Sequence, residues 1–359
     1  MKKNDIFVSI IFIVFLVAPN ILFWIFEDKM DHNVYENRLL AEKPKLTVNN
    51  ITKFPKEYEN YFNDHLPFKN EIRKLRSNLL LNIFNISSSQ NVIIGKNGWF
   101  FFTGESTLSD YTKTTIYSDD DKQKKYDLLI ETQNKLKNKN IDFYIFAIPN
   151  KETVYSDKLK GVVSQNPRKY TKAEDLLNYL QKDSQFKIIY PKDVLIEARK
   201  NYDTYYKYDT HWNDYGAYLG VLELMKFFDK NFKSTNVVID FELNRNGDLA
   251  KMNLTTNATN KEPVVNDFYD DINATCENIN NYSFCSSDKP LYGENILFVG
   301  DSFRLATIKY LSKLFNNSVF VHLQDYDESL LDKYNIDIVI FEFVERYSWY
   351  TGESGRIIS

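Results

Sequence analysis

The chain has 359 residues and a formal net charge of −4 at pH 7. This length allows one large α/β domain with additional segments, or two smaller domains. The weakly acidic balance argues against nucleic acid as a main partner.

An apolar run occupies residues 6–26, near the start of the chain. It is long enough to cross a bilayer as a helix. Lys2 and Lys3 precede the run and acidic residues follow it, so we expect the N-terminus in the cytoplasm and the rest outside. A cleaved signal peptide is the alternative, but the run is long for one and no clear Ala-x-Ala-like site follows. We therefore predict a transmembrane anchor over residues 1–30, in the cell membrane.

Residues 31–90 are predicted to form an extended and helical leader that packs on the domain that follows it. Helical patterns cover residues 55–63 and 68–84. Asp64 and His65 lie between them and are candidates for catalysis, but capping of a helix junction explains both better.

From residue 91 onward, strand patterns alternate with helix patterns after an initial hairpin at residues 92–102. Strands are expected at 141–148, 186–190, 295–299, 318–322 and 336–343, and helices at 118–139, 170–182, 194–200, 213–229 and 305–314. This alternation predicts an α/β domain with a mainly parallel sheet over residues 91–359.

The segment 253–290 is polar and rich in Asn, and we predict a long loop or irregular insertion there. It contains both cysteines of the chain, Cys276 and Cys285. In an exported protein these can form a disulfide. No further Cys or His pair lies near enough to complete a zinc site, so no metal is predicted.

The stretch from Asn295 to Phe303 predicts a strand that ends in a tight Gly-Asp-Ser turn before a helix. This is how an α/β protein presents a serine at the carboxyl end of its sheet, near helix N-terminal amides that stabilise an oxyanion. The Gly-Asp-Ser sequence alone is weak evidence, since small and acidic residues favour any turn. Ser302 is the candidate nucleophile.

A serine nucleophile needs a base, and the base needs a carboxylate that fixes its tautomer. Asp209 and His211 supply both groups from one short segment, and the chain has only four histidines. His322, at the end of an expected strand, is the rival base but has no carboxylate two residues before it. A metal site on Asp209 and His211 is the other alternative, and it lacks an evident third ligand.

Several short segments share their order and spacing with one family. They are residues 37–44, 62–68, 95–100, 149–155, 209–213, 247–250, 300–303 and 344–346. Together they resemble the AlgX/AlgJ-type, DHHW-like polysaccharide O-acetyltransferases, which are relatives of the SGNH hydrolases. The serine follows the Asp-x-His segment here, whereas ordinary SGNH hydrolases carry the serine first.

The resemblance implies an α/β/α sandwich that acetylates a secreted polysaccharide without a cofactor. Ser302 would be the nucleophile, His211 the base and Asp209 the group that orients the base. Substrate or oxyanion contacts are expected from Asn150, Lys151, Trp212 and Arg346, where Lys151 is equally well explained as a solvated loop lysine and Arg346 as the partner of a carboxylate.

The same resemblance implies two partners besides the polysaccharide acceptor. One is a membrane-bound O-acyltransferase that supplies the acetyl group, and the other is a polysaccharide synthase. Two alternatives remain open. The first is a carbohydrate acetyl esterase with the same three residues, and the second is a non-catalytic, membrane-tethered protein that binds glycans.

Overall fold

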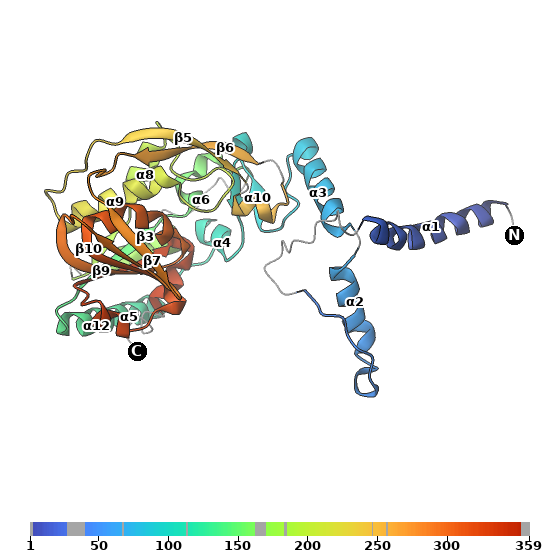
Figure 1. Cartoon of the computed structure of the whole chain (residues 1–359), viewed down its shortest axis with the longest axis horizontal. Helices are drawn as coiled ribbons and strands as arrows, with labels where there is room; N and C mark the ends of the chain where they lie inside the picture. The colour runs from blue at the N-terminus through green and yellow to red at the C-terminus, as the bar shows by residue number, and fades with distance from the viewer. Residues whose placement is uncertain are drawn as a thin grey trace. The chain divides into compact units, whose positions relative to one another are not determined.

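The computed structural model describes residues 3–26, 40–66, 68–112, 114–161, 170–182, 185–245, 247–255 and 258–352. The chain forms two compact units. The first comprises Met1–Ser89 with Ala250–Thr256, and the second comprises Gln90–Leu249 with Asn257–Ser359. Figure 1 draws both units, coloured by residue number from blue at the N-terminus to red at the C-terminus.

The first unit is helical. Its helices are α1 (Lys3–Phe26), the 3₁₀-helix η2 (Val48–Asn50), α2 (Phe54–Asp64), α3 (Lys69–Leu79) and the short π-helical segment η3 (Leu80–Phe84). Across the described ranges, no helix has both the length and the apolar character that crossing a membrane demands. The transmembrane character predicted for residues 1–30 is therefore unsupported.

Asp64 and His65, at the junction between α2 and α3, both bind backbone groups of the first unit. Asp64 Oδ2 accepts a hydrogen bond from the N–H of Ala41 at 2.8 Å, and His65 Nδ1 lies 2.8 Å from the carbonyl oxygen of Tyr61. These contacts fit the structural interpretation of Asp64 and His65 rather than a catalytic one.

A seven-stranded sheet forms the centre of the second unit, with the strand order β4-β3-β11-β9-β10-β8-β7. The strands are β3 (Asp142–Ile148), β4 (Lys187–Ile189), β7 (Ala274–Ile279), β8 (Tyr282–Ser287), β9 (Tyr292–Gly300), β10 (Phe315–His322) and β11 (Ile338–Val344). The five strands from β4 to β10 pair in parallel, whereas β8 and β7 are antiparallel. This confirms the predicted α/β fold with a mainly parallel sheet.

Helices cover both faces of this sheet, which gives three layers (Figure 1). One core lies under α8 (Lys192–Ala198), α9 (Asp214–Phe228) and α11 (Ile308–Leu314). The other lies under α5 (Asp119–Asn138), α7 (Lys172–Leu180) and α12 (Ser329–Lys333). Because the central strands are buried on both faces, β3 and β11 are almost continuously apolar.

Side chains cap the first turns of α5 and α9. The Ser118 hydroxyl accepts from the N–H of Asp121 at 3.1 Å at the start of α5. Asn213 Oδ1 accepts from the N–H of Gly216 at 3.0 Å and caps α9. Such side-chain acceptors satisfy amides that have no partner inside the helix.

Smaller elements complete the second unit. They are the 3₁₀-helices η4 (Lys96–Gly98), η5 (Ser156–Lys158), η7 (Ser302–Thr307), η8 (Leu323–Asp325) and η9 (Glu345–Gly352), the helices α4 (Thr107–Thr112) and α6 (Lys151–Val154), and the strand pairs β1 (Val92–Ile94) with β2 (Phe100–Phe102) and β5 (Val238–Arg245) with β6 (Thr259–Asn266). The pairing of β1 with β2 is antiparallel, which confirms the predicted hairpin. The helix α10 (Asp248–Met252) follows β5.

The prediction of an irregular insertion over residues 253–290 is wrong for most of that segment. It contains β6, and it forms β7 and β8 as a hairpin at the edge of the main sheet. Asn280 takes the left-handed conformation, with φ of 53°, in the turn between these strands. Cys276 and Cys285 lie directly opposite each other and form a disulfide across the two strands.

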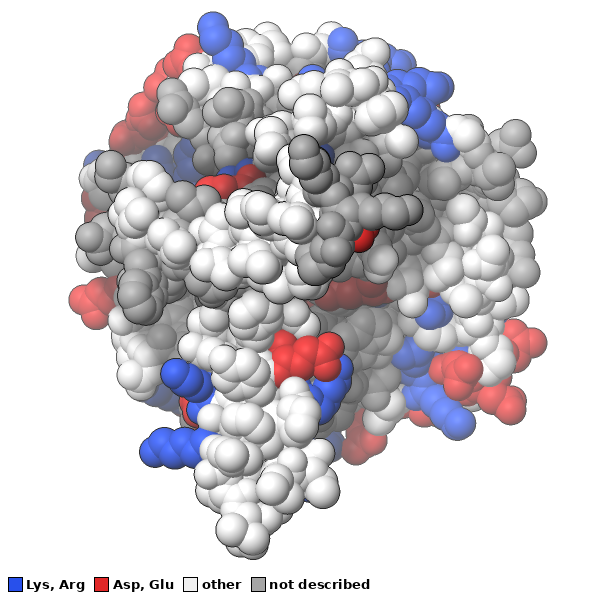
Figure 2. Space-filling view, turned by 90° about the vertical axis from the view of Figure 1, so that its right-hand side faces the viewer, with Lys and Arg blue, Asp and Glu red and all other residues white. Residues whose placement is uncertain are grey.

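Charged side chains form small, separated groups on the face drawn in Figure 2. Among the described residues of this face, Lys and Arg (blue) and Asp and Glu (red) are interspersed with uncharged residues (white). This distribution fits the small net charge and differs from the continuous basic surface that nucleic-acid binding uses.

Candidate active site

Ser302 lies at the carboxyl end of a central strand. The strand β9 ends at Gly300, and Ser302 begins the 3₁₀-helix η7, which leads into α11. The sequence predicted a single α-helix over residues 305–314, whereas the structure reaches α11 only after this 3₁₀ turn. Ser302 is partly exposed.

The side chain of Asp301 holds this turn in place. Its Oδ1 accepts from the N–H of Phe303 at 2.9 Å, and its Oδ2 accepts from the N–H of Val344 at 2.7 Å. The acid of Gly-Asp-Ser therefore ties the nucleophile turn to the end of the neighbouring strand β11.

A second carboxyl group lies beneath the turn. Glu342 is fully buried on β11, and its Oε2 accepts from the N–H of Asp301 at 3.0 Å. Burial, together with the nearby charge of Asp301, raises the pKa of Glu342 well above its usual range. No pattern in the sequence indicated a role for Glu342.

His211 connects the nucleophile to a carboxylate. Its Nε2 lies 2.7 Å from Ser302 Oγ, and its Nδ1 lies 2.6 Å from Asp209 Oδ1. Asp209 Oδ1 also accepts from the backbone N–H of His211 at 3.0 Å. The structure thus brings Ser302, His211 and Asp209 into one hydrogen-bonded chain, in the order that nucleophile, base and orienting acid require.

Charges around the imidazole favour its protonated form. Burial lowers the pKa of His211, but the hydrogen bond and charge of Asp209 and the charge of Asp248 outweigh it, and the net shift is upward. Burial raises the pKa of Asp209, but the hydrogen bond and charge of His211 hold that pKa well below its usual range. Asp209 therefore stays ionised beside the base.

Trp212 supports this loop from within the core. It is 1% exposed, and its Nε1 donates to the carbonyl oxygen of Phe303 at 3.1 Å. The next residue, Asn213, caps α9. The substrate contact expected of Trp212 is thus corrected to a packing role that joins the His211 loop to the nucleophile turn.

Lys151 is also buried behind the loop, with 2% of its surface exposed. Its Nζ donates to the carbonyl oxygens of Phe100, Lys207 and Asp209 at 2.7–2.9 Å. Burial lowers the pKa of Lys151 to about 8. With its three donors occupied, Lys151 is neither the substrate contact nor the solvated lysine that the sequence suggested.

Asn150 and Arg346 lie together at the same edge of the sheet. Each follows its strand by two residues, and Ile148 of β3 pairs with Val344 of β11. Asn150 Oδ1 lies 3.5 Å from Arg346 Nη1, and the guanidinium of Arg346 lies 5.5 Å from the ring centroid of Phe303. Arg346 thus lies beside the nucleophile turn and contacts Asn150, and the oxyanion or substrate contacts expected of both residues stay a prediction.

Arg346 also has an acidic partner. Its Nε lies 3.5 Å from Glu105 Oε2. The structure therefore shows Arg346 paired with a carboxylate, which is one of the two roles that the sequence indicated. This pairing does not exclude a contact between Arg346 and a substrate.

His322 does not reach the nucleophile in this arrangement. It ends β10, and its Nδ1 accepts from the N–H of Gln324 at 3.2 Å, where it caps a turn. The hydrogen bond to Ser302 comes from His211 instead.

Asp248 is a residue that sequence reasoning did not connect to the site. With Asp209 and His211 it forms a cluster whose potential metal-ligating atoms lie within 4.8 Å of one another. Both ring nitrogens of His211 already face hydrogen-bond partners, Asp209 and Ser302. This arrangement fits a proton-transfer chain better than a metal site.

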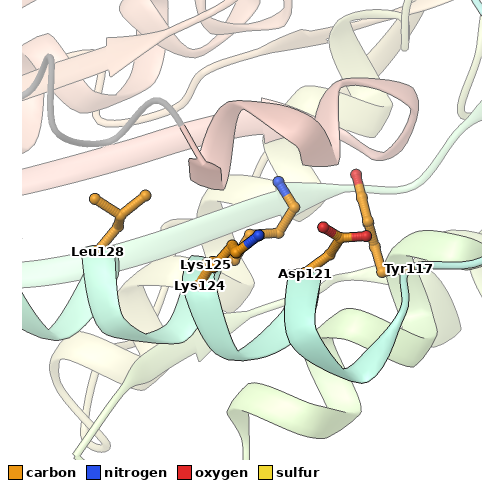
Figure 3. A pocket seen from close by; sticks show the side chains of 5 residues that line it. All are labelled: Tyr117, Asp121, Lys124, Lys125 and Leu128. Atoms are coloured by element: carbon orange, nitrogen blue, oxygen red, sulfur yellow. The ribbon is translucent and has the colours of Figure 1, made fainter.

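A cavity of about 410 Å³ lies at the first turns of α5 (Figure 3). Its lining residues are Tyr117, Asp121, Lys124, Lys125 and Leu128. Lys125 Nζ donates to the carbonyl oxygen of Trp349 at 3.1 Å, and the Tyr117 hydroxyl lies 3.0 Å from Ser348 Oγ. Ser302, His211 and Asp209 do not line this cavity.

The three-layer fold, with a serine turn after a central parallel strand and a histidine beside it, defines an SGNH-hydrolase-like protein. Residues 92–324 match the family model described as the SGNH hydrolase-like domain of the acetyltransferase AlgX. This match spans more than half of the chain, so the chain belongs to the AlgX-type family of SGNH-hydrolase-like acetyltransferases. This confirms the resemblance noted in the sequence.

Solved structures share the fold at low sequence identity. The structure of Bacillus cereus PatB1 is 19% identical, covers 72% of this chain and 97% of its own, and has a TM-score of 0.52. A structure of PatB1 with a sulfonyl adduct has a TM-score of 0.53 at the same identity, covering 72% of this chain and 96% of its own. A DHHW family protein from Eubacterium siraeum DSM 15702 is 12% identical, covers 74% and 93%, and also has a TM-score of 0.53. No curated protein matches the chain.

Proposed function

We propose that this protein is an O-acetyltransferase that carries an acetyl group on Ser302 and transfers it to a hydroxyl of a secreted polysaccharide. Membership of the AlgX-type acetyltransferase family supports the class of reaction. The observation that carries the mechanism is the hydrogen-bonded chain from Ser302 through His211 to Asp209.

In the first half-reaction, His211 Nε2 takes the proton of the Ser302 hydroxyl while Oγ attacks the acetyl carbonyl of the donor. The tetrahedral intermediate collapses, the bond to the donor oxygen breaks, and His211 returns its proton to that oxygen. In the second half-reaction, His211 deprotonates a sugar hydroxyl, which attacks the acetyl-serine. The ester with Ser302 breaks, and the serine regains its proton from His211.

The negative oxygen of each intermediate needs donors that are already in place. Among the described residues, neither the backbone N–H of Ser302 nor Asn150 Nδ2 has a hydrogen-bond partner. We assign these two groups to the oxyanion hole, with the guanidinium of Arg346 providing positive charge nearby. Asn150→Ala should therefore slow acylation of Ser302, and an unchanged acylation rate would remove Asn150 from this role.

The site of action is proposed to lie outside the cytoplasm. The disulfide between Cys276 and Cys285 supports this, because such bonds persist in oxidising compartments. The donor is proposed to be an acetyl group delivered through a membrane-bound O-acyltransferase, in cooperation with a polysaccharide synthase. Alkylation of both cysteines in intact cells without a reductant would contradict the proposed location.

Acceptor use separates the transferase from an esterase that uses the same three residues. The purified protein should be incubated with an acetyl ester and a panel of oligosaccharides, and both acetylated sugar and free acetate should be measured. We expect acetylated sugar with at least one acceptor, and loss of both products in Ser302→Ala. Acetate release in wild type without any sugar product would favour the esterase, and equal turnover in Ser302→Ala would refute the proposed nucleophile.

A further inference from the structure

A second acidic side chain lies beside the imidazole, outside the steps described above. Asp248 follows Gly247 after strand β5 and begins α10. Its Oδ2 lies 3.7 Å from His211 Nδ1, the nitrogen that also faces Asp209. The side chain is 30% exposed, so it lies at the rim of the site.

Asp248 holds the segment 209–211 at three points. Its backbone N–H donates to Asp209 Oδ2 at 2.8 Å, which occupies the oxygen of Asp209 that His211 does not use. Its Oδ1 accepts from the backbone N–H of Thr210 at 2.8 Å, and its Oδ2 accepts from the Thr210 hydroxyl. The orientation of Asp209 and the path of the His211 loop therefore both depend on Asp248.

Residues 247–248 approach the segment 208–209 so closely that position 247 requires a glycine. A Cβ atom built on Gly247 would lie 2.8 Å from Asp209 Cβ and would overlap the carbonyl oxygen of Tyr208. Real Cβ atoms essentially never make such contacts. The glycine therefore allows the backbone at 247–248 to pack directly against the loop that carries His211.

The charges around His211 are unequal. Burial and the charge of Arg346 lower the pKa of His211, whereas Asp209 and Asp248 raise it, and the net shift is upward. Lys151 lies behind the loop, where it binds the carbonyl oxygen of Asp209. Burial and the charge of Asp209 raise the pKa of Asp248, as expected for two carboxyl groups that face one imidazole.

We propose that Asp248 is a positioning residue, which fixes the Asp209–His211 segment and places a second negative charge beside the imidazolium formed when Ser302 loses its proton. This inference rests on the proposed function and adds a fourth residue to its machinery. Asp248 acts through Asp209 and His211, and it does not touch the reacting atoms.

The test measures how fast Ser302 reacts with an aryl sulfonyl fluoride across a pH series. In this reaction Ser302 Oγ bonds to sulfur, the sulfur–fluorine bond breaks, fluoride leaves, and His211 takes the serine proton. Intact-protein mass spectrometry gives the labelling rate for wild type, Asp248→Asn, Asp248→Ala and Glu277→Gln. The last variant removes one exposed carboxylate from the edge strand β7 and is the matched control.

Asp248→Asn keeps an oxygen for the Thr210 N–H but loses the negative charge. We expect its labelling rate to fall by roughly threefold to tenfold, and the acidic limb of the pH profile to move to lower pH, because His211 loses a charge that favours its protonated form. Asp248→Ala should show the same displacement and a maximal rate at least about tenfold below wild type, because the loop also loses its anchor. Glu277→Gln should match wild type.

If the acidic limb of the pH profile is unchanged in Asp248→Asn, the inference is overturned, even if the labelling rate falls. A purely structural residue would lower the labelling rate without moving the pH profile. If Asp248→Ala does not fold by near-ultraviolet circular dichroism, Asp248→Asn alone decides. Absence of labelling at Ser302 in wild type would instead contradict the proposed nucleophile, so the two failures are distinguishable.

Discussion

Gly300 packs directly against the carboxyl group of Glu342, beneath the turn that carries Ser302. A Cβ atom on Gly300 would overlap Glu342 Oε2 and would lie 2.9 Å from Glu342 Cβ. The same oxygen, Oε2, accepts from the N–H of Asp301. The glycine of Gly-Asp-Ser is therefore needed because a buried carboxyl group on the neighbouring strand occupies the space beside it.

Gly300→Ala should displace the nucleophile turn. We expect a loss of about 1–3 kcal/mol in the free energy of unfolding, as in other overpacked cores, together with a lower acylation rate of Ser302. Urea unfolding and the labelling rate measure the two effects. Gly293→Ala, also on β9, is the matched control, because a Cβ there meets nothing within 4 Å. Equal stability and activity of the two variants would contradict the close packing.

Asp209→Asn should leave the fold intact and remove most of the activity. An amide cannot stabilise the imidazolium as a carboxylate does, and it favours the wrong tautomer of His211, so we expect a loss of roughly 10³-fold to 10⁴-fold in turnover. Acetate release or sugar acetylation measures it. Asp193→Asn removes an exposed carboxylate from the first turn of α8 and should behave as wild type. Turnover in Asp209→Asn within about tenfold of wild type would remove Asp209 from the role of orienting acid.

The pH dependence of acylation should follow His211. The base must be neutral, and its pKa is raised above 6.5, so the rate should fall as pH drops through a midpoint above 6.5. Acetylation or sulfonylation rates from pH 5 to about 9 give this midpoint. A midpoint below 6.5 would mean that Asp209 and Asp248 do not dominate the charge around the imidazole.

Glu345 should make stability depend on pH. Its buried carboxyl group accepts from the N–H of Asn150 and the hydroxyl of Thr153, and burial, with the charge of Glu174, raises its pKa from 4.5 to about 7. The folded state thus prefers the neutral acid, and this contribution is complete below pH 4.5 and lost as pH rises through about 7.

Glu345→Gln removes this titration while keeping an oxygen as acceptor. Relative to wild type, the variant should gain on the order of 3 kcal/mol in free energy of unfolding between about pH 4 and pH 8. Urea unfolding over this range measures it, with the exposed Glu277→Gln as control. A constant difference between Glu345→Gln and wild type across the range would show that Glu345 does not titrate there.

Local signals were sufficient to predict the central sheet and the hydrogen-bonded triad. The apolar strand before Gly300 has to be buried, the turn residues end it, and Asp209 with His211 offers a base and its carboxylate within one turn. Order along the chain does not matter for such a site, since the carboxyl ends of parallel strands and their loops meet at one edge. The structure accordingly brings His211 and Ser302 within hydrogen-bonding distance.

Other features depend on contacts that the sequence does not display. The hairpin of β7 and β8 lies at the sheet edge, where exposed polar side chains replace the apolar alternation typical of a strand. The two Asn residues at its turn were a local signal for a hairpin. Lys151 and Trp212 were taken for substrate contacts because nothing local reveals that carbonyl oxygens and aromatic rings enclose them. Asp248 reaches Asp209 only through the tertiary contact that Gly247 permits.

The most direct test of Ser302 as the acetyl carrier is intact-protein and peptide mass spectrometry of the whole protein after incubation with an acetyl ester, for wild type and Ser302→Ala. We expect one added acetyl mass on the wild-type protein, located on Ser302, absent from the variant, and lost when an accepting oligosaccharide is supplied. An acetyl group on another residue, or equal modification of Ser302→Ala, would contradict the proposal that Ser302 carries the acetyl group.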